Sequence, residues 1–392
     1  MATRTTNTRT TSAVFAPSAD SCPQEGHAVL SFGSLVAAYF DCRRTKRNTA
    51  SALAFEVNLE QNLAELYEEL INGTYNPGRS ICFVITHPKP REVWAAAFRD
   101  RVVHHLIYNA IADRFQRRFI ADSCACIPGR GTLYAVKRLE SKIRSITQNW
   151  SRRAFYLKCD LANFFVAIDK RILDSQLADR IHEPFWLDLT RRILWHDPRT
   201  NYELHGNPKL LARVPQHKHL TNQPETYGLP IGNLSSQFFA NVYLDSLDQF
   251  VKHQICCRHY IRYVDDFVLL HESPQWLNDA HQRINTFLPE QLNAHLNPKK
   301  TILQPIDRGV DFVGQVIKPW RRTVRRRTVS NATHRITTVA PDKLLETANS
   351  YFGLCRQATH SHRDRVRLSR AAFRRGHSVD FTLTKTFRRA NF

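Results

Sequence analysis

The sequence predicts an α+β fold in which strands and helices are mixed without strict strand–helix–strand alternation. Two observations carry this prediction. Short apolar runs have the pattern of strands, most clearly at residues 155–160 and 258–271, whereas other segments have helical periodicity or helix caps. The chain of 392 residues, 42% apolar and 10% aromatic, is also long enough for roughly two or three domains with a sizeable core.

The first part of the chain is predicted mainly from helix start and stop signals. Asn58 and Gln61 have capping-box spacing before a stripe of leucines, and Gly73 ends that helix. In order, we expect a disordered segment at 1–24, a helix between Asn58 and Gly73, a strand at 80–86, a long buried helix at 92–115, and a turn at 128–131 that leads into another helix.

The second part of the chain is predicted from strand patterns and from one polar interruption. Residues 196–226 are rich in Pro, His and Asn without periodicity, and they predict an inserted loop. Around it we expect a strand at 155–160, a helix at 237–251, a strand–turn–strand unit at 258–271 with its bend at Asp265-Asp266, a strand at 310–317 and a helix at 341–375.

The charge of the chain indicates a polyanionic partner. Lys and Arg number 56 against 35 Asp and Glu, which gives a net charge of +21, and such an excess is typical of nucleic-acid binding. No run of about 18 apolar residues is present, so we expect no membrane-spanning helix and no membrane partner. The nine cysteines are irregularly spaced without a C-x-x-C pair, which favours a reducing, intracellular protein.

Three acids are the strongest candidates for chemistry. Asp265 and Asp266 lie at the bend between two apolar strands, where two carboxylates repel each other and lose hydration. A simple hairpin turn would explain that pair by itself, since Asp is a turn former. Asp160, however, ends another apolar strand about a hundred residues earlier. Together, three carboxylates can hold two divalent cations about 4 Å apart, an arrangement used for in-line phosphoryl displacement.

These acids belong to a longer series of motifs that resembles the reverse transcriptases. The resemblance is collinear over residues 30–375, roughly. It is carried by the fingers-like segments at 89–105 and 128–131, the catalytic-like segments at 158–165 and 263–266, the nucleotide-pocket-like segment at 228–241, and the segments at 297–301 and 312–314. It implies a right-hand polymerase with fingers at 25–150, a palm of antiparallel sheet plus helices at 151–320, a helical thumb at 335–376 and a basic tail at 377–392.

The resemblance also implies roles for individual residues. Asp160, Asp265 and Asp266 would be catalytic, and with Leu161 they would bind two Mg²⁺ ions, for which Mn²⁺ could substitute. Contacts to the incoming dNTP would come from Lys89, Arg91, Phe165, Ile231, Gly232, Gln237 and Lys299.

Several of these residues also have plainer interpretations. Phe165 would act as a steric gate against the 2′-hydroxyl, or it is a core residue. Lys89 and Arg91 would hold phosphate oxygens, or they are solvated charges. Lys300 is an equal alternative to Lys299 for protonating pyrophosphate.

The basic segments predict where nucleic acid binds. Arg321, Arg322, Arg325, Arg326 and Arg327 form a dense basic run, and the segment from Arg356 to the C-terminus has ten Lys or Arg against two acids. One-signed charge of this kind fits contacts to the backbone of a template RNA, a cDNA or primer strand, or a structured RNA.

One departure from the usual motif indicates a subgroup. Where most reverse transcriptases have Gln and Pro, this chain has Ile231 and Gln237, which resembles the enzymes of diversity-generating retroelements. That likeness implies errors opposite template adenines, a small basic pentameric accessory protein, and a cytoplasmic enzyme of bacterial or phage origin. One alternative is an antiphage-defence reverse transcriptase with a non-coding RNA template. The other is an RNA-binding scaffold with an inactive palm, but the presence of all three acids argues against a scaffold.

Overall fold

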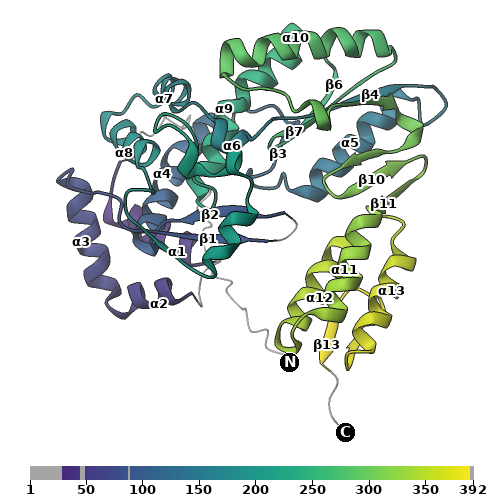
Figure 1. The fold of residues 1–392 in the computed structure, drawn as a ribbon. Helices are drawn as coiled ribbons and strands as arrows, with labels where there is room; N and C mark the ends of the chain where they lie inside the picture. Colours follow the sequence, from purple (N-terminus) through teal and green to yellow (C-terminus); the bar gives the residue numbers. More distant parts are fainter. Residues whose placement is uncertain (1–28, 45–48, 87–88, 389–392) are drawn as a thin grey trace, which may run out of the picture.

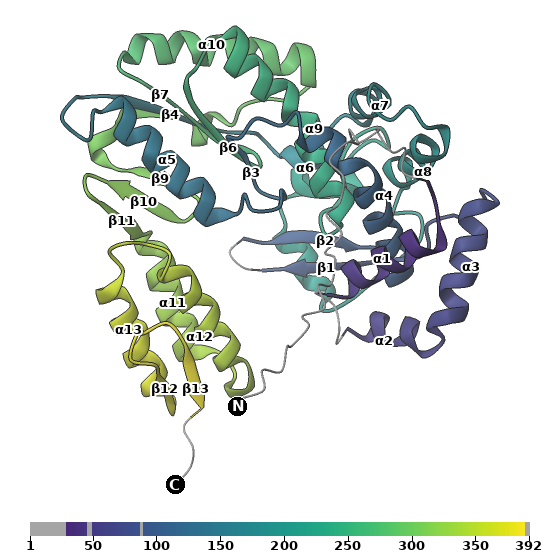
Figure 2. The same cartoon turned by 180° about the vertical axis from the view of Figure 1, so that it is seen from behind.

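The α+β class predicted from the sequence is confirmed. The structure is a computed structural model that describes residues 29–44, 49–86 and 89–388 (Figure 1). The segment expected to be disordered, 1–24, lies outside these residues. Helical and mixed regions surround a central five-stranded sheet, and a separate helical unit lies at the C-terminal end (Figures 1 and 2). Within the described part of the chain, no helix is both long and apolar enough to cross a membrane.

The central sheet, which we call the palm sheet, has the strand order β3-β6-β7-β4-β8. Its strands are β3 (Ser123–Cys124), β4 (Phe155–Asp160), β6 (His259–Tyr263), β7 (Asp266–His271) and β8 (Ile302–Pro305). The predicted strand–turn–strand unit is the β6–β7 hairpin, and β4 pairs antiparallel with β7 so that Asp160 lies opposite Asp266. Two strands that are distant in sequence therefore place their acids at one end of the sheet.

Side-chain alternation along these strands separates the two faces of the palm sheet. Leu157 and Leu269 join a core with helices α9 (Leu234–Gln249) and α10 (Pro274–Leu292). Tyr156 and Val268 join a second core with helix α5 (Thr132–Ile146). The sheet is buried on both faces, which holds its acidic end in a fixed place.

The N-terminal region is mostly helical and includes a smaller sheet, which we call the fingers sheet. Its helices are α1 (Phe32–Arg43), α2 (Ala50–Val57), α3 (Leu59–Ile71) and α4 (Phe98–Gln116), and its sheet has the order β2-β1-β5, with β1 (Ser80–Ile85), β2 (Arg91–Ala95) and β5 (Tyr202–Leu204). The prediction of a helix at 92–115 is therefore wrong for its first residues. Residues 91–95 instead pair antiparallel with β1, and the helix begins only at Phe98.

The predicted inserted loop at 196–226 contains regular structure. Its strand β5 pairs parallel with β1, and short 3₁₀ helices follow (Pro208–Arg213, Gln216–Lys218 and Leu220–Asn222). Glu92 anchors the segment to β2: its carboxylate accepts from His219 Nδ1 at 2.8 Å and from the Leu220 backbone N–H at 2.8 Å. The polar composition of the segment predicted a loop, and its anchoring could not be predicted because Glu92 lies more than a hundred residues away in sequence.

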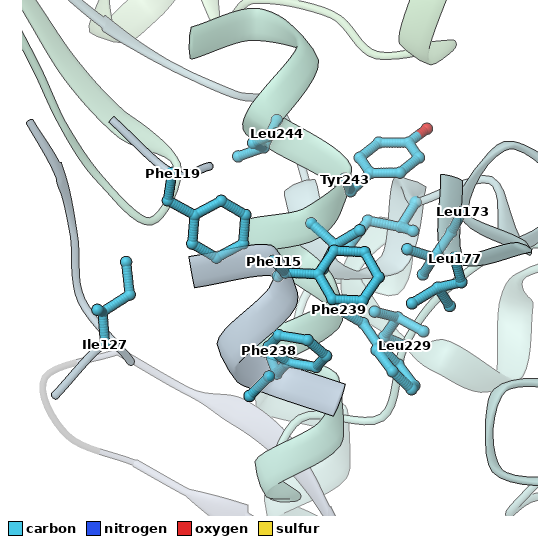
Figure 3. Close-up of a cluster of buried hydrophobic side chains, with 14 of the residues drawn as sticks. Phe115, Phe119, Ile127, Leu173, Leu177, Leu229, Phe238, Phe239, Tyr243 and Leu244 are labelled. Atoms are coloured by element: carbon cyan, nitrogen blue, oxygen red, sulfur yellow. The ribbon is translucent and has the colours of Figure 1, made fainter. Parts of the chain in front are cut away.

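Aromatic packing joins the N-terminal helices to the palm (Figure 3). Phe238 of α9 makes edge-to-face contacts with Tyr108 and Phe115 of α4, with ring centroids 5.6 and 5.5 Å apart. Leu173 and Leu177 of helix α7 (Lys170–Ala178) complete the cluster, next to helix α8 (Pro184–Trp195). His104 of α4 is buried and bonds Ser235 Oγ at 2.5 Å, which gives it a structural role.

The C-terminal third forms a small sheet and a helical unit, which we call the thumb. The sheet has the order β11-β10-β9, from β9 (Val310–Phe312), β10 (Gln315–Lys318) and β11 (Arg321–Val324). The thumb has helices α11 (Arg326–Thr338), α12 (Pro341–Cys355) and α13 (His362–Phe373), followed by the hairpin of β12 (His377–Val379) and β13 (Thr386–Arg388).

Three expectations for this region are corrected. The strand expected at 310–317 is a hairpin, because Val313 and Gly314 turn the chain with positive φ angles. The helix expected at 341–375 is interrupted between α12 and α13. Regular structure also starts before the expected thumb, at Arg326, and extends into the expected tail as the β12–β13 hairpin.

Candidate active site

The three predicted acids meet at one end of the palm sheet. Asp160 is the last residue of β4, Asp266 is the first residue of β7, and the two are directly paired across the strands. Asp265 lies in the β6–β7 turn, where its carbonyl oxygen accepts from the Leu161 backbone N–H at 3.3 Å. A cross-strand pair and a turn residue thus bring together acids that are a hundred residues apart.

A buried arginine supports the turn that carries Asp265. Val264, the preceding residue, has φ +55°, a conformation that is costly for a β-branched residue. Arg262 Nη1 donates to the Val264 carbonyl oxygen at 3.0 Å and so holds the turn in this conformation. Arg262 itself has no exposed side-chain surface.

The remaining donors of Arg262 are also satisfied. It forms a bidentate pair with the fully buried Asp248, at 2.8 Å from Nε and 2.6 Å from Nη2. It also donates to Asn241 Oδ1 at 3.2 Å and to Ser123 Oγ at 2.7 Å. Sequence reasoning missed this network. The only available signal was a charged residue within an apolar strand next to the acidic bend.

Burial and mutual repulsion raise the pKa of the turn carboxylates. Burial, and then the neighbouring charge of Asp160, raise the pKa of Asp265 above its usual range. Burial raises the pKa of Asp266 to about 6, although Lys158 acts in the opposite direction. Both carboxylates are partly buried, and an added positive charge beside them would stabilise their ionised form.

Two lysines contact the acids. Lys158 Nζ lies 2.9 Å from Asp266 Oδ2, and Lys300 Nζ lies 2.5 Å from Asp160 Oδ2. The second oxygen of Asp266, Oδ1, is buried and has no hydrogen-bond partner. Among the residues that the structure describes, no group of three or more His, Cys, Asp or Glu side chains is already arranged as a metal site. The donor set and the unpartnered buried oxygen nevertheless fit a hard divalent cation.

Basic side chains surround the acids. The positive charges of Lys300 and Lys218 help burial to lower the pKa of Lys89, and Asp160 acts in the opposite direction. The positive charge of Arg91 acts to lower the pKa of Asp265. Lys89 and Arg91 therefore lie within electrostatic reach of the carboxylate end, in a cationic environment suited to phosphate oxygens.

The structure distinguishes Lys299 from Lys300. Lys300 reaches Asp160, whereas Lys299 is exposed and uses its backbone N–H to bond Asn297 Oδ1 at 3.2 Å. Of the two alternatives that the sequence left open, Lys300 is therefore the lysine that contacts the acids in this structure. The two lysines are adjacent in a 3₁₀ turn, Pro298–Lys300, so sequence spacing could not show which one points to the site.

Phe165 lies on a short helix just after Asp160. Helix α6 (Phe164–Ala167) starts after Asn163, which has a left-handed conformation, and Phe165 packs edge-on against the buried Phe164 with centroids 5.4 Å apart. Phe165 itself is half-buried, and its carbonyl accepts from Leu229 N–H at 2.8 Å. This partial exposure leaves ring surface for a ligand while the backbone is fixed to the 228–233 segment.

The segment of Ile231 and Gly232 is docked on strand β2. The Ile231 carbonyl accepts from Trp94 N–H at 2.7 Å, and Asn233 Oδ1 accepts from Ala96 N–H at 3.1 Å. Gly232 has φ +133°, and a Cβ atom there would lie 2.8 Å from Val93 Cγ1 and 3.0 Å from the Trp94 carbonyl. Only glycine fits this close approach, so the segment is rigidly placed.

Gln237 and the basic run complete the predicted site residues. Gln237 is exposed, and its Oε1 accepts from Cys126 Sγ at 3.2 Å. Arg322 is buried and pairs with Glu140 at 2.8 Å, so it is not exposed for the predicted contact with nucleic acid. Arg325 bonds Asp311, whereas Arg321, Arg326 and Arg327 are exposed. The five arginines of the basic run thus have three different environments: one is buried, one is bonded to an acid, and three are exposed.

Comparison with known proteins agrees with this site. The model of the family described as reverse transcriptase (RNA-dependent DNA polymerase) matches residues 88–317, which include all three acids and the palm sheet. A protein described as the COX1/OXI3 intron 2 protein of Saccharomyces cerevisiae is 22% identical over 238 aligned residues. That alignment covers 44% of this chain and 24% of the yeast protein, so the chain matches about a quarter of that relative's length.

Proposed function

We propose that this chain, which belongs to the reverse transcriptase family, acts as an RNA-directed DNA polymerase with Asp160, Asp265 and Asp266 as its catalytic carboxylates. One observation carries this proposal: Asp160 pairs across the sheet with Asp266, directly beside the Asp265 turn. In this proposal the attacking 3′-hydroxyl and the α-phosphate of a dNTP meet at this end of the sheet, opposite the template RNA.

Reverse transcriptases in general use divalent metal ions, and we propose Mg²⁺ held by Asp160, Leu161, Asp265 and Asp266. Hard oxygen donors and the unpartnered buried Oδ1 of Asp266 support this choice, and Mn²⁺ has similar ligand preferences. When bound, two such ions would activate the attacking hydroxyl and stabilise the leaving pyrophosphate. The ammonium groups of Lys158 and Lys300 would then have to move away from the carboxylates that they now contact.

The chain's own residues would orient the dNTP. Lys89, Arg91 and Lys300 would bind triphosphate oxygens, because their charges already act on the acids or on one another. Phe165 would lie under the sugar and exclude a 2′-hydroxyl. Ile231, Gly232 and Gln237 would line the side of the pocket, with the backbone of Ile231 fixed by β2.

We further propose that the enzyme serves sequence diversification in a retroelement. Ile231 supports this, since it offers bulk but no hydrogen-bond donor or acceptor where most relatives have Gln. The loss of one orienting hydrogen bond is worth about 1 kcal/mol, roughly a several-fold loss of discrimination. Asn233, Ser236 and Gln237 would contribute the rest, and a small basic pentameric protein would be the partner.

Sequencing of the cDNA tests this proposal. Purified protein with an RNA template, dNTPs and Mg²⁺ should make cDNA whose errors concentrate opposite template adenines, and Ile231→Gln should reduce those errors while synthesis continues. Errors spread evenly over the four template bases would contradict diversification and favour the antiphage-defence alternative. Absence of synthesis with every template and ion would favour a scaffold.

A further inference from the structure

The outer face of α13 carries a row of arginines. Arg363, Arg367, Arg370 and Arg374 are all exposed, and their spacing of four, three and four residues places them on one side of the helix. The row is about 16 Å long at a rise of 1.5 Å per residue. The opposite side of the helix, with Leu368 and Ala372, packs into the thumb core. The arginines therefore face away from that core.

This face is directed away from the fingers sheet. In both views, α11 and α12 lie between α13 and the strands β1 and β2 (Figures 1 and 2). The arginine row is thus a different surface from the carboxylate end of the palm sheet and from the dNTP-facing residues of the fingers.

The neighbouring hairpin presents an exposed aromatic ring on a backbone that is tied to α13. Asp380 organises the hairpin tip, because its Oδ1 accepts from the backbone N–H groups of Thr384 and Lys385 at 2.6 and 2.7 Å. Arg365 of α13 donates to the Thr382 carbonyl at 2.6 Å and ties the tip to the helix. Phe381, at this tip, is fully exposed at 102%. An uncovered ring on a tethered backbone is a stacking surface for a planar ligand.

The charge of this surface has one sign. The described residues from Arg356 to Arg388 include nine Lys or Arg and two acids, Asp364 and Asp380. Asp380 is hydrogen-bonded within the hairpin turn and Asp364 is only partly exposed, so the exposed groups of this surface are mainly cationic. An exposed array of guanidinium groups suits phosphate, which the planar fork of arginine binds in a bidentate manner.

We propose that the α13 arginine row and the β12–β13 hairpin form a second RNA-binding surface, separate from the carboxylate site. The arginines contact successive phosphates, and Phe381 stacks on an unpaired base. The choice of RNA rests on the proposed function, since an RNA-directed polymerase must hold a structured template. Such a surface would keep one part of the RNA bound to the thumb while another part is copied.

Equilibrium binding to the full-length protein tests this surface. The probe is a fluorescent RNA hairpin with a single-stranded loop, measured with a short RNA–DNA template–primer duplex in saturating excess to occupy the carboxylate site. Arg363→Gln, Arg367→Gln, Arg370→Gln and Arg374→Gln together should weaken binding at least about tenfold. They should also flatten the dependence of log K on log salt by about 3, since each phosphate contact contributes about 0.7. Gln preserves helix propensity, so the fold should be retained.

A charge-matched control separates a specific surface from net charge. Arg44, Arg152, Arg258 and Arg308 are exposed arginines of the fingers and palm, and their joint change to Gln should leave hairpin binding near wild type. Phe381→Ala should weaken the looped hairpin by about fivefold to a hundredfold, the range for one lost base–aromatic stack, and should leave a loopless RNA duplex unaffected.

Two results would overturn the inference. If the control variant binds the RNA hairpin as weakly as the α13 variant, the effect is due to overall charge. If the α13 variant keeps its affinity for the RNA hairpin and its salt dependence, the face does not bind RNA and would suit an acidic protein partner. Primer extension on the short duplex is measured in parallel and should be normal in the α13 variant. If the wild-type protein does not extend primers but the α13 variant still shows the expected loss of RNA-hairpin binding, the proposed function is contradicted and the RNA-binding surface is not.

Discussion

The arginines of the palm and those of the thumb have opposite surroundings. Arg262 has no exposed side-chain surface and donates to Asp248, Asn241, Ser123 and the Val264 carbonyl. The arginine row of α13 is exposed on a helix whose other face packs in the thumb core. Arginine therefore holds the Asp265 turn in the palm, where all its donors are used within the protein. On α13, where the side chains are exposed, arginine is available to a polyanion.

The difference teaches how charge should be read in this chain. A net charge of +21 predicts a polyanionic partner but does not say which residues meet it. In the basic run, Arg322 pairs with Glu140 and is buried, whereas Arg326 and Arg327 are exposed at the start of α11. Burial and pairing, which depend on the tertiary structure, decide which cations are available.

The largest effect should come from the acids that the palm network positions. Asp265→Asn should reduce primer extension by about 10³-fold or more, because it removes a charge from the proposed cation site with little change in shape. The melting temperature should stay close to that of the wild type. Asp307→Asn, at an exposed acid outside the site, is the control and should extend primers normally. Comparable activity in the two variants would remove Asp265 from the catalytic residues.

The next effect tests whether Arg262 positions the turn or only stabilises the core. Arg262→Met should lower the free energy of unfolding by about 3–5 kcal/mol, because it leaves Asp248 buried without its partner. Arg262→Met with Asp248→Leu removes both charges and should recover much of that loss. If Arg262 positions the turn, kcat should remain at least about tenfold low in the double variant, because the Val264 carbonyl still lacks its donor. Recovery of both stability and kcat would mean that the pair is structural alone.

A smaller effect is expected at Phe165, which is partly exposed. Phe165→Ala should raise the use of ribonucleotides relative to dNTPs by about tenfold, since a hydrophobic contact of this size is worth about 1–3 kcal/mol. Competition between a ribonucleotide and its dNTP on one template measures the ratio. Phe164→Leu, at the buried neighbouring ring, is the control and should change stability more than selectivity. An unchanged ratio in Phe165→Ala would make this ring a core residue.

The smallest effect compares the exposed and buried members of the basic run. Arg326→Gln with Arg327→Gln should flatten the salt dependence of template–primer binding by about 1.5–2 and leave the melting temperature unchanged. Arg322→Gln should instead lower the melting temperature and leave the slope unchanged, because Arg322 forms an ion pair with Glu140 and donates to the Gln357 carbonyl within the protein. The reverse pattern would show that exposure does not identify the phosphate contacts.

Much of the fold could be predicted because its signals are local. Strand β4 was predicted at 155–160 with its observed bounds, and the β6–β7 hairpin was predicted from two apolar runs around an acidic bend. The predictions failed where one local pattern suits two structures. The apolar run of residues 93–95 suits a buried helix or a buried strand, and only pairing with β1 made residues 91–95 a strand.

The sequence by itself determined the class of fold, the residue types at the acidic end of the palm sheet and the excess of positive charge, because alternation, turn formers and net charge are properties of neighbouring residues or of the whole composition. Only the tertiary structure decided that Lys300 and not Lys299 reaches Asp160, that Arg262 holds the Val264 carbonyl, and that Arg322 is buried. The physical reason is that each outcome depends on contacts with residues distant in sequence or on the direction of one side chain. Neither is encoded in the spacing of neighbouring residues.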